Sequence, residues 1–236
     1  MMIWYYHVGY MEDGLMIKII YEDNHILVVK KPFNMPMQED SSKDEDLLSY
    51  LKKWLKDKYN KPNNVYLGLV HRLDRPTGGV CIFAKTSKAA SRLSDQIRQN
   101  KFNKKYLAIV NDYNLKSSDT YIDHLLKDSK TNISKVSKDG KYCELSYEVL
   151  AKKDNLAKVL IQLKTGRSHQ IRVQFASRKQ YLFGDQKYSP IAKKGTQLAL
   201  WAYSLSFTHP VTKEYLEFKI EPDNCYPFNI GGKHDN

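Results

Sequence analysis

The segment that most constrains the fold of this chain runs from residue 71 to residue 86, where a charged loop leads directly into an apolar run. The loop reads HRLDRPTGG, and the run after it, VCIFA, has the length and composition of a buried strand that ends before Lys85. A proline and two glycines just before the strand favour a tight turn. Asp74 lies between Arg72 and Arg75 there. Taken alone, this pattern is most simply explained by a structural ion pair between the carboxylate and an arginine.

A strong positive charge accompanies this segment. The 236 residues are 42% hydrophobic, enough for a sizeable core, and they carry 38 Lys and Arg against 26 Asp and Glu, for a net charge of +12. Such an excess attracts polyanions, either nucleic acid or an anionic membrane surface. The sequence shows no lipidation motif and no run near the ~20 apolar residues of a membrane span, so nucleic acid is favoured.

The three cysteines, Cys81, Cys143 and Cys225, are widely spaced and include no CxxC pair. Their number and spacing fit neither a disulfide framework nor a zinc site. Cys81 lies inside the apolar run and is expected to be a buried thiol. We therefore expect a cytoplasmic protein without a metal site.

Short apolar runs distributed along the chain predict both strands and helices. Strands are expected at residues 17–21, 26–30, 80–84, 106–110, 143–150, 156–163, 198–207 and 214–220. Helices are expected at residues 47–55, after Thr86 or Ser87, and at residues 169–177. The candidate N-caps are Ser41, Ser42 or Asp44 for the first helix and Ser168 for the last. Residues 111–141 are polar and should form loops around one short strand at 121–126.

A second unusual motif lies at residues 164–173, which read KTGRSHQIRV. Together with HRLDRPTGGV it resembles the RluA-type family of RNA pseudouridine synthases. That family has a His-Arg-Leu-Asp run closed by Thr, a small residue and Gly, and a downstream Gly-Arg-Ser/Thr-His-Gln-Ile-Arg pattern. The resemblance covers residues 17–221. Gly78 stands where relatives usually carry Ser, Ser189 where they carry Gly, and Trp201 where they often carry His.

The resemblance implies an α+β fold with a mixed, mainly antiparallel central sheet, flanking helices and loops, and an RNA-binding cleft. It implies an isomerase that flips a uridine out of its stack and converts it to pseudouridine without a cofactor. Residue by residue, it implies that Asp74 is the catalytic carboxylate, that Arg167 is its cation partner, and that Tyr106 in KKYLAIV stacks on the target base. Asp74 could attack the sugar, add to the base, or begin by removing a ribose proton.

Other residues of the motifs are expected to bind RNA or the substrate nucleotide. Arg72 lies two residues from Asp74, and in an extended segment such residues point the same way, so Arg72 could fill the space that the flipped base leaves. The remaining candidates lie in or beside the motifs: Lys31, His71, Thr77, His169 and Arg172. A dense basic stretch at Lys101, Lys104 and Lys105 could contact phosphates or simply be solvated.

We expect one catalytic domain, because no internal repeat or linker-like stretch divides the chain. This domain is placed at residues 16–225, with an N-terminal extension at 1–15, expected to be flexible, and a C-terminal tail at 226–236. The extension lacks the basic start and the long apolar middle of a signal peptide. Translation could start at Met1 or at Met16.

Two other classes of function are compatible with a basic chain. An RNA hydrolase could use His71 and His169 as acid and base, and a metal-dependent version would add Asp74 and Asp185. A non-catalytic RNA-binding protein would need only the basic surface. Neither explains a carboxylate inside one motif and an arginine-led second motif. The favoured function is therefore a monomeric, cytoplasmic pseudouridine synthase that acts on ribosomal or transfer RNA and does not bind membranes.

Overall fold

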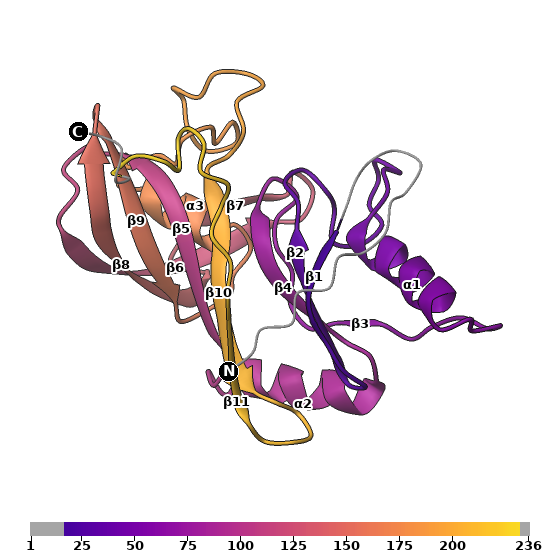
Figure 1. Cartoon of the computed structure of the whole chain (residues 1–236). Helices are drawn as coiled ribbons and strands as arrows, with labels where there is room; N and C mark the ends of the chain where they lie inside the picture. The colour runs from indigo at the N-terminus through magenta and orange to yellow at the C-terminus, as the bar shows by residue number, and fades with distance from the viewer. Residues whose placement is uncertain (1–16, 232–236) are drawn as a thin grey trace. The chain divides into compact units, whose positions relative to one another are not determined.

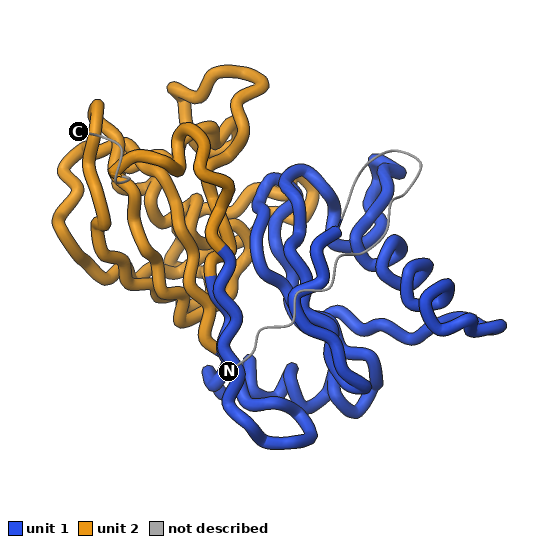
Figure 2. The backbone as a smooth tube through the Cα atoms, in the orientation of Figure 1, with its two compact units in different colours: residues 1–102, 204–220 blue, residues 103–203, 221–236 orange. Residues whose placement is uncertain are grey.

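The computed structural model describes residues 17–231, which contain eleven strands and three helices (Figure 1). The expected N-terminal extension lies outside these described residues. The predicted α+β class is confirmed. The chain divides into two compact units, coloured separately in Figure 2. Unit 1 comprises Met1–Phe102 and Ser204–Ile220, and unit 2 comprises Asn103–Tyr203 and Glu221–Asn236. Two compact units are thus present although the sequence shows no linker-like stretch.

Unit 1 is built on strands that carry the apolar runs of the sequence. They are β1 (Lys18–Glu22), β2 (Ile26–Lys31), β3 (Gly68–Leu69), β4 (Gly78–Ala84) and β11 (Tyr215–Lys219), while β10 (Leu200–Thr208) contributes residues to both units. β1 and β2 form an antiparallel hairpin. β2 also pairs antiparallel with β4, where Lys31 lies opposite Gly79. Because β4 directly follows the charged loop, this pairing attaches the loop to the core of the unit.

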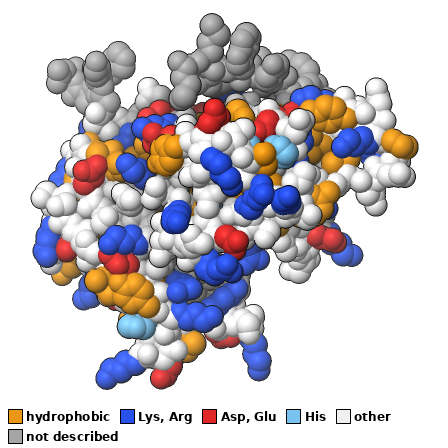
Figure 3. All heavy atoms as spheres, turned by 90° about the horizontal axis from the view of Figure 1, so that it is seen from below, with side chains coloured by type: hydrophobic (Ala, Val, Ile, Leu, Met, Phe, Trp, Pro, Cys, Tyr) orange, Lys and Arg blue, Asp and Glu red, His pale blue; other side chains and the backbone are white. Residues whose placement is uncertain are grey.

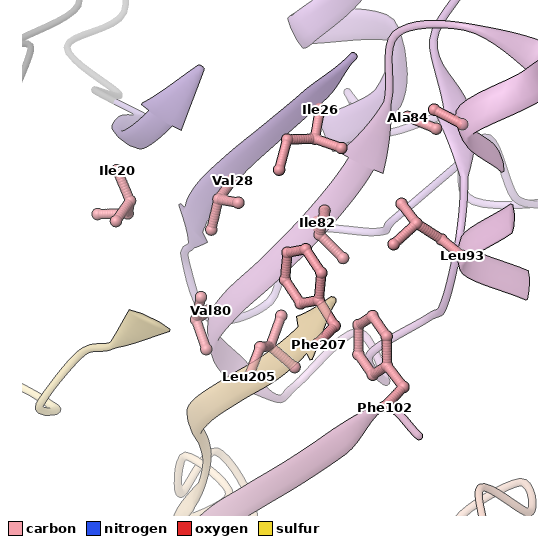
Figure 4. Packing of buried hydrophobic residues seen from close by; sticks show 11 residues of the cluster. Ile20, Ile26, Val28, Val80, Ile82, Ala84, Leu93, Phe102, Leu205 and Phe207 are labelled. Carbon is pink, nitrogen blue, oxygen red and sulfur yellow. The ribbon is translucent and has the colours of Figure 1, made fainter. Parts of the chain in front are cut away.

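The core of unit 1 surrounds β4, whose seven residues are all buried. Val80 and Ile82 pack with Val28 of β2 and with Phe207 of β10, as the close view in Figure 4 shows. The helix α2 (Ser87–Arg98) contributes buried Ala89 and Leu93, and Thr86 caps it by accepting the backbone N–H of Ala89 at 3.1 Å. Thr86, one of the two predicted caps, is therefore the N-cap of α2.

The helix α1 (Leu47–Lys58) begins three residues after Asp44, the last of the predicted caps. Its N-cap is Asp46, whose side chain accepts the backbone N–H of Ser49 at 3.0 Å, so the prediction of Ser41, Ser42 or Asp44 is wrong. Those residues instead form a short hydrogen-bonded turn, in which Asp40 accepts from the backbone and the hydroxyl of Ser42. Any of these polar residues suits a cap, and the backbone path selects among them.

Unit 2 contains a meander of antiparallel strands. In spatial order they are β5 (Asn103–Asn111), β9 (Leu156–Leu163), β8 (Lys141–Lys153), β6 (Ser118–Asp128) and β7 (Ile133–Val136). The strand expected at 121–126 is present within β6, but the expectation of loops around it is wrong, because β6 is longer and forms a hairpin with β7. In β6 only Tyr121 and Leu125 are buried. Most of its other residues are polar, so the composition of this strand is that of a loop.

The last helix, α3 (Gln170–Ala176), is shorter than predicted and is not capped by Ser168. His169 occupies the N-cap position in a left-handed conformation, with a φ of 54°, and its side chain makes no capping hydrogen bond. The predicted tail at 226–236 starts within unit 2, where Phe228 and Ile230 are buried and Lys158 of β9 donates to the carbonyl oxygen of Phe228 at 3.0 Å. This part of the tail packs onto the unit.

Basic side chains are spread over the face of the molecule that Figure 3 shows, in keeping with the net charge. Within residues 17–231, no helix combines the length and the apolar character that crossing a membrane requires. Cys81 is a buried thiol, as predicted, and burial raises its pKa to about 12. Cys143 is buried as well, and Cys225 is exposed.

Candidate functional site

The first motif forms a loop at residues 71–77 between β3 and β4, called here the 71–77 loop. Leu73 is buried and anchors it, whereas Asp74 is half-buried. The backbone N–H of Thr77 donates to the carbonyl oxygen of Asp74 at 2.9 Å, which closes a tight turn. Gly79 follows with a φ of +119°, a conformation that strains residues with a Cβ. The turn therefore fixes the backbone of Asp74 within unit 1.

Lys31, at the end of β2, supports this loop from inside unit 1. Its side chain is fully buried, and its Nζ donates to the carbonyl oxygens of Pro32 at 3.0 Å, of Arg75 at 3.0 Å and of Thr77 at 2.7 Å. An ammonium group has three protons, and these three acceptors match them in number. Two of the acceptors belong to the turn that contains Asp74. Lys31 therefore holds that turn against β2 and β4.

The burial of Lys31 changes the role predicted for it. Burial lowers its pKa to about 8, and the neighbouring Cys81 and Asp74 side chains act in the opposite direction. The sequence placed Lys31 among the residues that bind RNA. In the structure its ammonium is enclosed and donates to backbone carbonyls. The predicted role in binding RNA is therefore corrected: Lys31 supports the 71–77 loop.

Arg75 attaches the outer side of the loop to the preceding part of the chain. Its Nε donates to the carbonyl oxygen of Asn34 at 3.1 Å, and one terminal nitrogen donates to Ser42 Oγ at 2.9 Å. The other terminal nitrogen contacts the carboxylate of Asp44. Arg75 thus pairs with an acidic residue that lies far from it in the sequence. The simpler interpretation of this loop, an ion pair between Asp74 and Arg75, does not describe these contacts.

The other predicted residues of this loop differ in exposure. His71 Nε2 accepts the backbone N–H of Ile82 at 3.2 Å, and its ring centroid lies 5.8 Å from that of Phe102. This ring nitrogen is therefore bonded to the backbone of β4. That contact weakens the hydrolase alternative, which needs His71 as an acid or a base. Thr77 is 2% exposed, and its hydroxyl has no hydrogen-bond partner among residues 17–231. Arg72 is exposed. Substrate contacts of all three stay predictions.

The second motif forms a compact turn in unit 2 that Gln170 organises. Gln170 is 3% exposed, and its Oε1 accepts from the hydroxyl of Thr165 at 2.8 Å and from the backbone N–H of Arg167 at 3.0 Å. Its Nε2 donates to the carbonyl oxygen of Glu144 at 3.1 Å and to Gln174 Oε1 at 3.0 Å. Sequence reasoning missed this role, because the motif shows where Gln170 is but not which groups it bonds.

Arg167 is exposed on this turn. Its Nε donates to the carbonyl oxygen of Tyr142 in β8 at 3.0 Å, and its terminal nitrogens have no hydrogen-bond partner among residues 17–231. Tyr106 is 7% exposed on β5, where it opposes Ile161 of β9. Asp74 belongs to unit 1, and Arg167 and Tyr106 belong to unit 2. The predicted pairing of Asp74 with Arg167 stays a prediction.

Two further predicted residues have partners within unit 2. His169 Nδ1 lies 2.6 Å from the hydroxyl of Tyr188, which also accepts the backbone N–H of Ser134 at 2.9 Å. Arg172 is 6% exposed, and its guanidinium binds the carboxylate of Asp185 through two hydrogen bonds of 2.9 and 2.6 Å. Arg172 was predicted to bind RNA, and its burial and bidentate pairing instead give it a structural role.

The metal-dependent alternative does not fit these contacts. It required Asp185 as a ligand, yet this carboxylate is 1% exposed and is paired with Arg172, and its Oδ1 also accepts the backbone N–H of Lys187 at 3.1 Å. In the part of the chain that the structure describes, no three His, Cys, Asp or Glu side chains gather as metal ligands. Asp185 therefore fixes α3 and the turn at 184–188.

Comparisons with known proteins agree on one family. Residues 25–177 match the family model described as RNA pseudouridylate synthase. The chain is 30% identical over 223 residues to the ribosomal large subunit pseudouridine synthase C of Buchnera aphidicola, across 89% of this chain and 69% of that protein. It is 32% identical over 222 residues to the dual-specificity RNA pseudouridine synthase RluA of Haemophilus influenzae, across 88% and 94%.

A solved structure supports the fold. The human RNA pseudouridylate synthase domain containing 4 aligns with a TM-score of 0.74 at 22% identity. The alignment covers 87% of this chain and 88% of that chain. At this identity the likeness shows the fold alone.

Proposed function

We propose, since this chain belongs to the RNA pseudouridylate synthase family, that the 71–77 loop carries its catalytic carboxylate, Asp74. The chain is an RNA pseudouridine synthase, an isomerase that converts uridine in RNA to pseudouridine. One observation carries the assignment of Asp74. This carboxylate is half-buried on a turn that the Thr77 N–H closes and that Lys31 holds by hydrogen bonds.

The reaction suits a fixed carboxylate. The bond between C1′ of the ribose and N1 of uracil breaks, a bond between C1′ and C5 forms, C5 loses its proton and N1 gains one. Positive charge develops on the sugar as the first bond breaks, and a carboxylate beside C1′ can stabilise this charge or bond to the carbon. Nothing enters from outside and nothing is oxidised, so we propose that the enzyme needs no cofactor.

Three other residues are proposed to complete the site. Arg167 keeps Asp74 ionised, because a guanidinium can hold a carboxylate by two hydrogen bonds, and its terminal nitrogens have no partner among the described residues. Tyr106 provides the aromatic platform for the flipped uracil. Arg72, exposed two residues from Asp74, fills the space that the base leaves.

The proposed substrate is RNA of the large ribosomal subunit, and the proposed location is the cytoplasm. Several relatives are named for that ribosomal subunit, and one is named as a dual-specificity RNA pseudouridine synthase. Transfer RNA, which the resemblance of the motifs also implies, stays a second proposed substrate. The net charge of +12 supports a polyanionic partner of either kind. We propose that the enzyme acts as a monomer.

Tritium release tests this function. RNA labelled with tritium at C5 of uridine, isolated from cells that lack the gene, is incubated with wild type, Asp74→Asn and Asp57→Asn. Asp57 is an exposed carboxylate of α1 and serves as the control. We expect full release by wild type and Asp57→Asn, and a loss of at least about a thousandfold for Asp74→Asn, whose amide can neither ionise nor bond to C1′. Release by Asp74→Asn at the wild-type rate would remove Asp74 from the mechanism, and strand scission would favour a hydrolase.

A further inference from the structure

Lys104, in β5 of unit 2, is a buried cation without a counter-charge. The residue is 8% exposed, and no described residue forms a hydrogen bond or an ion pair with its ammonium. Burial lowers its pKa, and no neighbouring carboxylate acts in the opposite direction. Buried lysines are rare unless they are paired, because removing the charge from water costs free energy that only a partner offsets. The described residues of unit 2 supply no such partner.

The ammonium of Lys104 lies at the turn of the second motif. A Cβ built on Gly166 would be 3.1 Å from Lys104 Nζ, so the missing side chain of Gly166 leaves room at that nitrogen. Arg167 follows directly, and the hydrogen bond from its backbone N–H to Gln170 fixes the turn. Lys104 and Arg167 are therefore two cations at one turn, Lys104 largely buried and Arg167 exposed.

Lys104 and Tyr106 point to the same face of β5. They are two residues apart, and β9 opposes them with Leu163 and Ile161, while Lys105 between them faces the other way. Two residues of a strand span about 6.6 Å. A nucleotide has its base and its phosphate on opposite sides of the ribose, so one nucleotide could contact the ring of Tyr106 with its base and the ammonium of Lys104 with its phosphate.

We propose that Lys104 binds a phosphate of the RNA substrate, beside the uridine that Tyr106 contacts. This inference rests on the proposed function, which supplies the RNA and the role of Tyr106. A phosphodiester provides the anion that Lys104 lacks among the described residues of unit 2, and the compact charge of an ammonium is a common phosphate ligand. The absence of an internal partner keeps the ammonium available for that phosphate.

The test compares Lys104→Met with Lys105→Met, which removes the same charge from the opposite face of the strand. The dissociation constant of each variant for unmodified large-subunit ribosomal RNA, transcribed in vitro, is measured over a series of salt concentrations. For Lys104→Met we expect affinity to fall roughly tenfold. The slope of log K against log salt should become shallower by about 0.7 to 0.9, the contribution of one phosphate contact. For Lys105→Met we expect both quantities to stay close to wild type.

Two readouts separate this inference from its alternatives. The thermal midpoint of Lys104→Met without RNA should equal or exceed that of wild type, because Met removes an unpaired buried charge. A lower midpoint, or an unchanged salt slope, would overturn the proposal. Tritium release by wild type tests the proposed function separately. If wild type releases tritium and Lys104→Met binds RNA like wild type, only the role of Lys104 fails; if wild type releases none, the binding series still decides that role.

Discussion

Lys31 in unit 1 and Lys104 in unit 2 are 0% and 8% exposed, and burial lowers the pKa of both. Both lie on strands next to one of the two motifs. Lys31 donates to three backbone carbonyls, whereas Lys104 has no partner among the described residues. The hydrogen bonds of one buried lysine are thus satisfied within its unit, whereas those of the other are not satisfied by any described residue. A buried cation with internal acceptors supports a fold, and one without them is suited to a ligand.

Arg172 offers the strongest test of what an internally paired cation contributes. It is a buried cation of unit 2, like Lys104, but Asp185 holds it through two hydrogen bonds. We expect Arg172→Met to lower the free energy of unfolding by about 3–5 kcal/mol, because it leaves a carboxylate buried and unpaired. Urea denaturation measures this loss. Combining it with Asp185→Asn should recover part of the stability, and full additivity of the two losses would contradict the pairing.

Lys31→Met should have the next largest effect. The substitution keeps the apolar stem but leaves the carbonyl oxygens of Pro32, Arg75 and Thr77 without their donor. We expect a loss of about 3 kcal/mol in unfolding free energy, since each buried acceptor without a partner costs about 1–3 kcal/mol and removal of the buried charge offsets part of the sum. Tritium release should fall too, because the turn that carries Asp74 is no longer held. Unchanged activity would show that the turn does not depend on Lys31.

The pH dependence of stability distinguishes the charge of Lys31 from its packing. Its pKa is about 8 in the folded state and about 10.4 when unfolded, so between these values the unfolded chain binds more protons and stability rises with pH. From about pH 7 to about pH 9, wild type should gain about 1.4 kcal/mol relative to Lys31→Met. Urea denaturation of both proteins at the two pH values measures the difference. Parallel pH profiles would show that Lys31 does not titrate in this range.

Gly166→Ala should have the smallest effect. The new methyl group would lie 3.1 Å from Lys104 Nζ, the end of a flexible side chain that can shift. We expect little change in stability but a loss of roughly threefold in RNA affinity, because the methyl group takes space that the phosphate would use. Comparing it with the same substitution in the Lys104→Met background supplies the control. An equal loss in both backgrounds would separate Gly166 from Lys104.

Local patterns were enough to predict most of the strands and the family of this chain. The apolar runs at 80–84 and 156–163 identified β4 and β9, because strand length and β-branched composition are local properties. The two motifs identified the family because their residues keep a fixed order. The α+β class follows from these same observations.

Tertiary contacts decided what the sequence could not predict. Lys31 and Arg172 both lie in or beside motifs, and nothing in their local pattern showed that carbonyl groups and Asp185 would enclose them. The strand expected at 121–126 proved to be the middle of the longer β6, whose full length was not predicted because only one residue in four along that middle is buried. Lys104 was one of three neighbouring lysines, and only its burial distinguishes it from Lys105.

The most direct measurement is the unfolding free energy of wild type and Lys104→Met, each with and without unmodified large-subunit ribosomal RNA. A ligand that binds the folded state stabilises it according to its affinity. We predict that Lys104→Met is at least as stable as wild type without RNA and gains less stability when RNA is added, by about 1.4 kcal/mol for a tenfold loss of affinity. A variant that is less stable alone, and that gains as much from RNA as wild type does, would contradict the distinction between the two lysines.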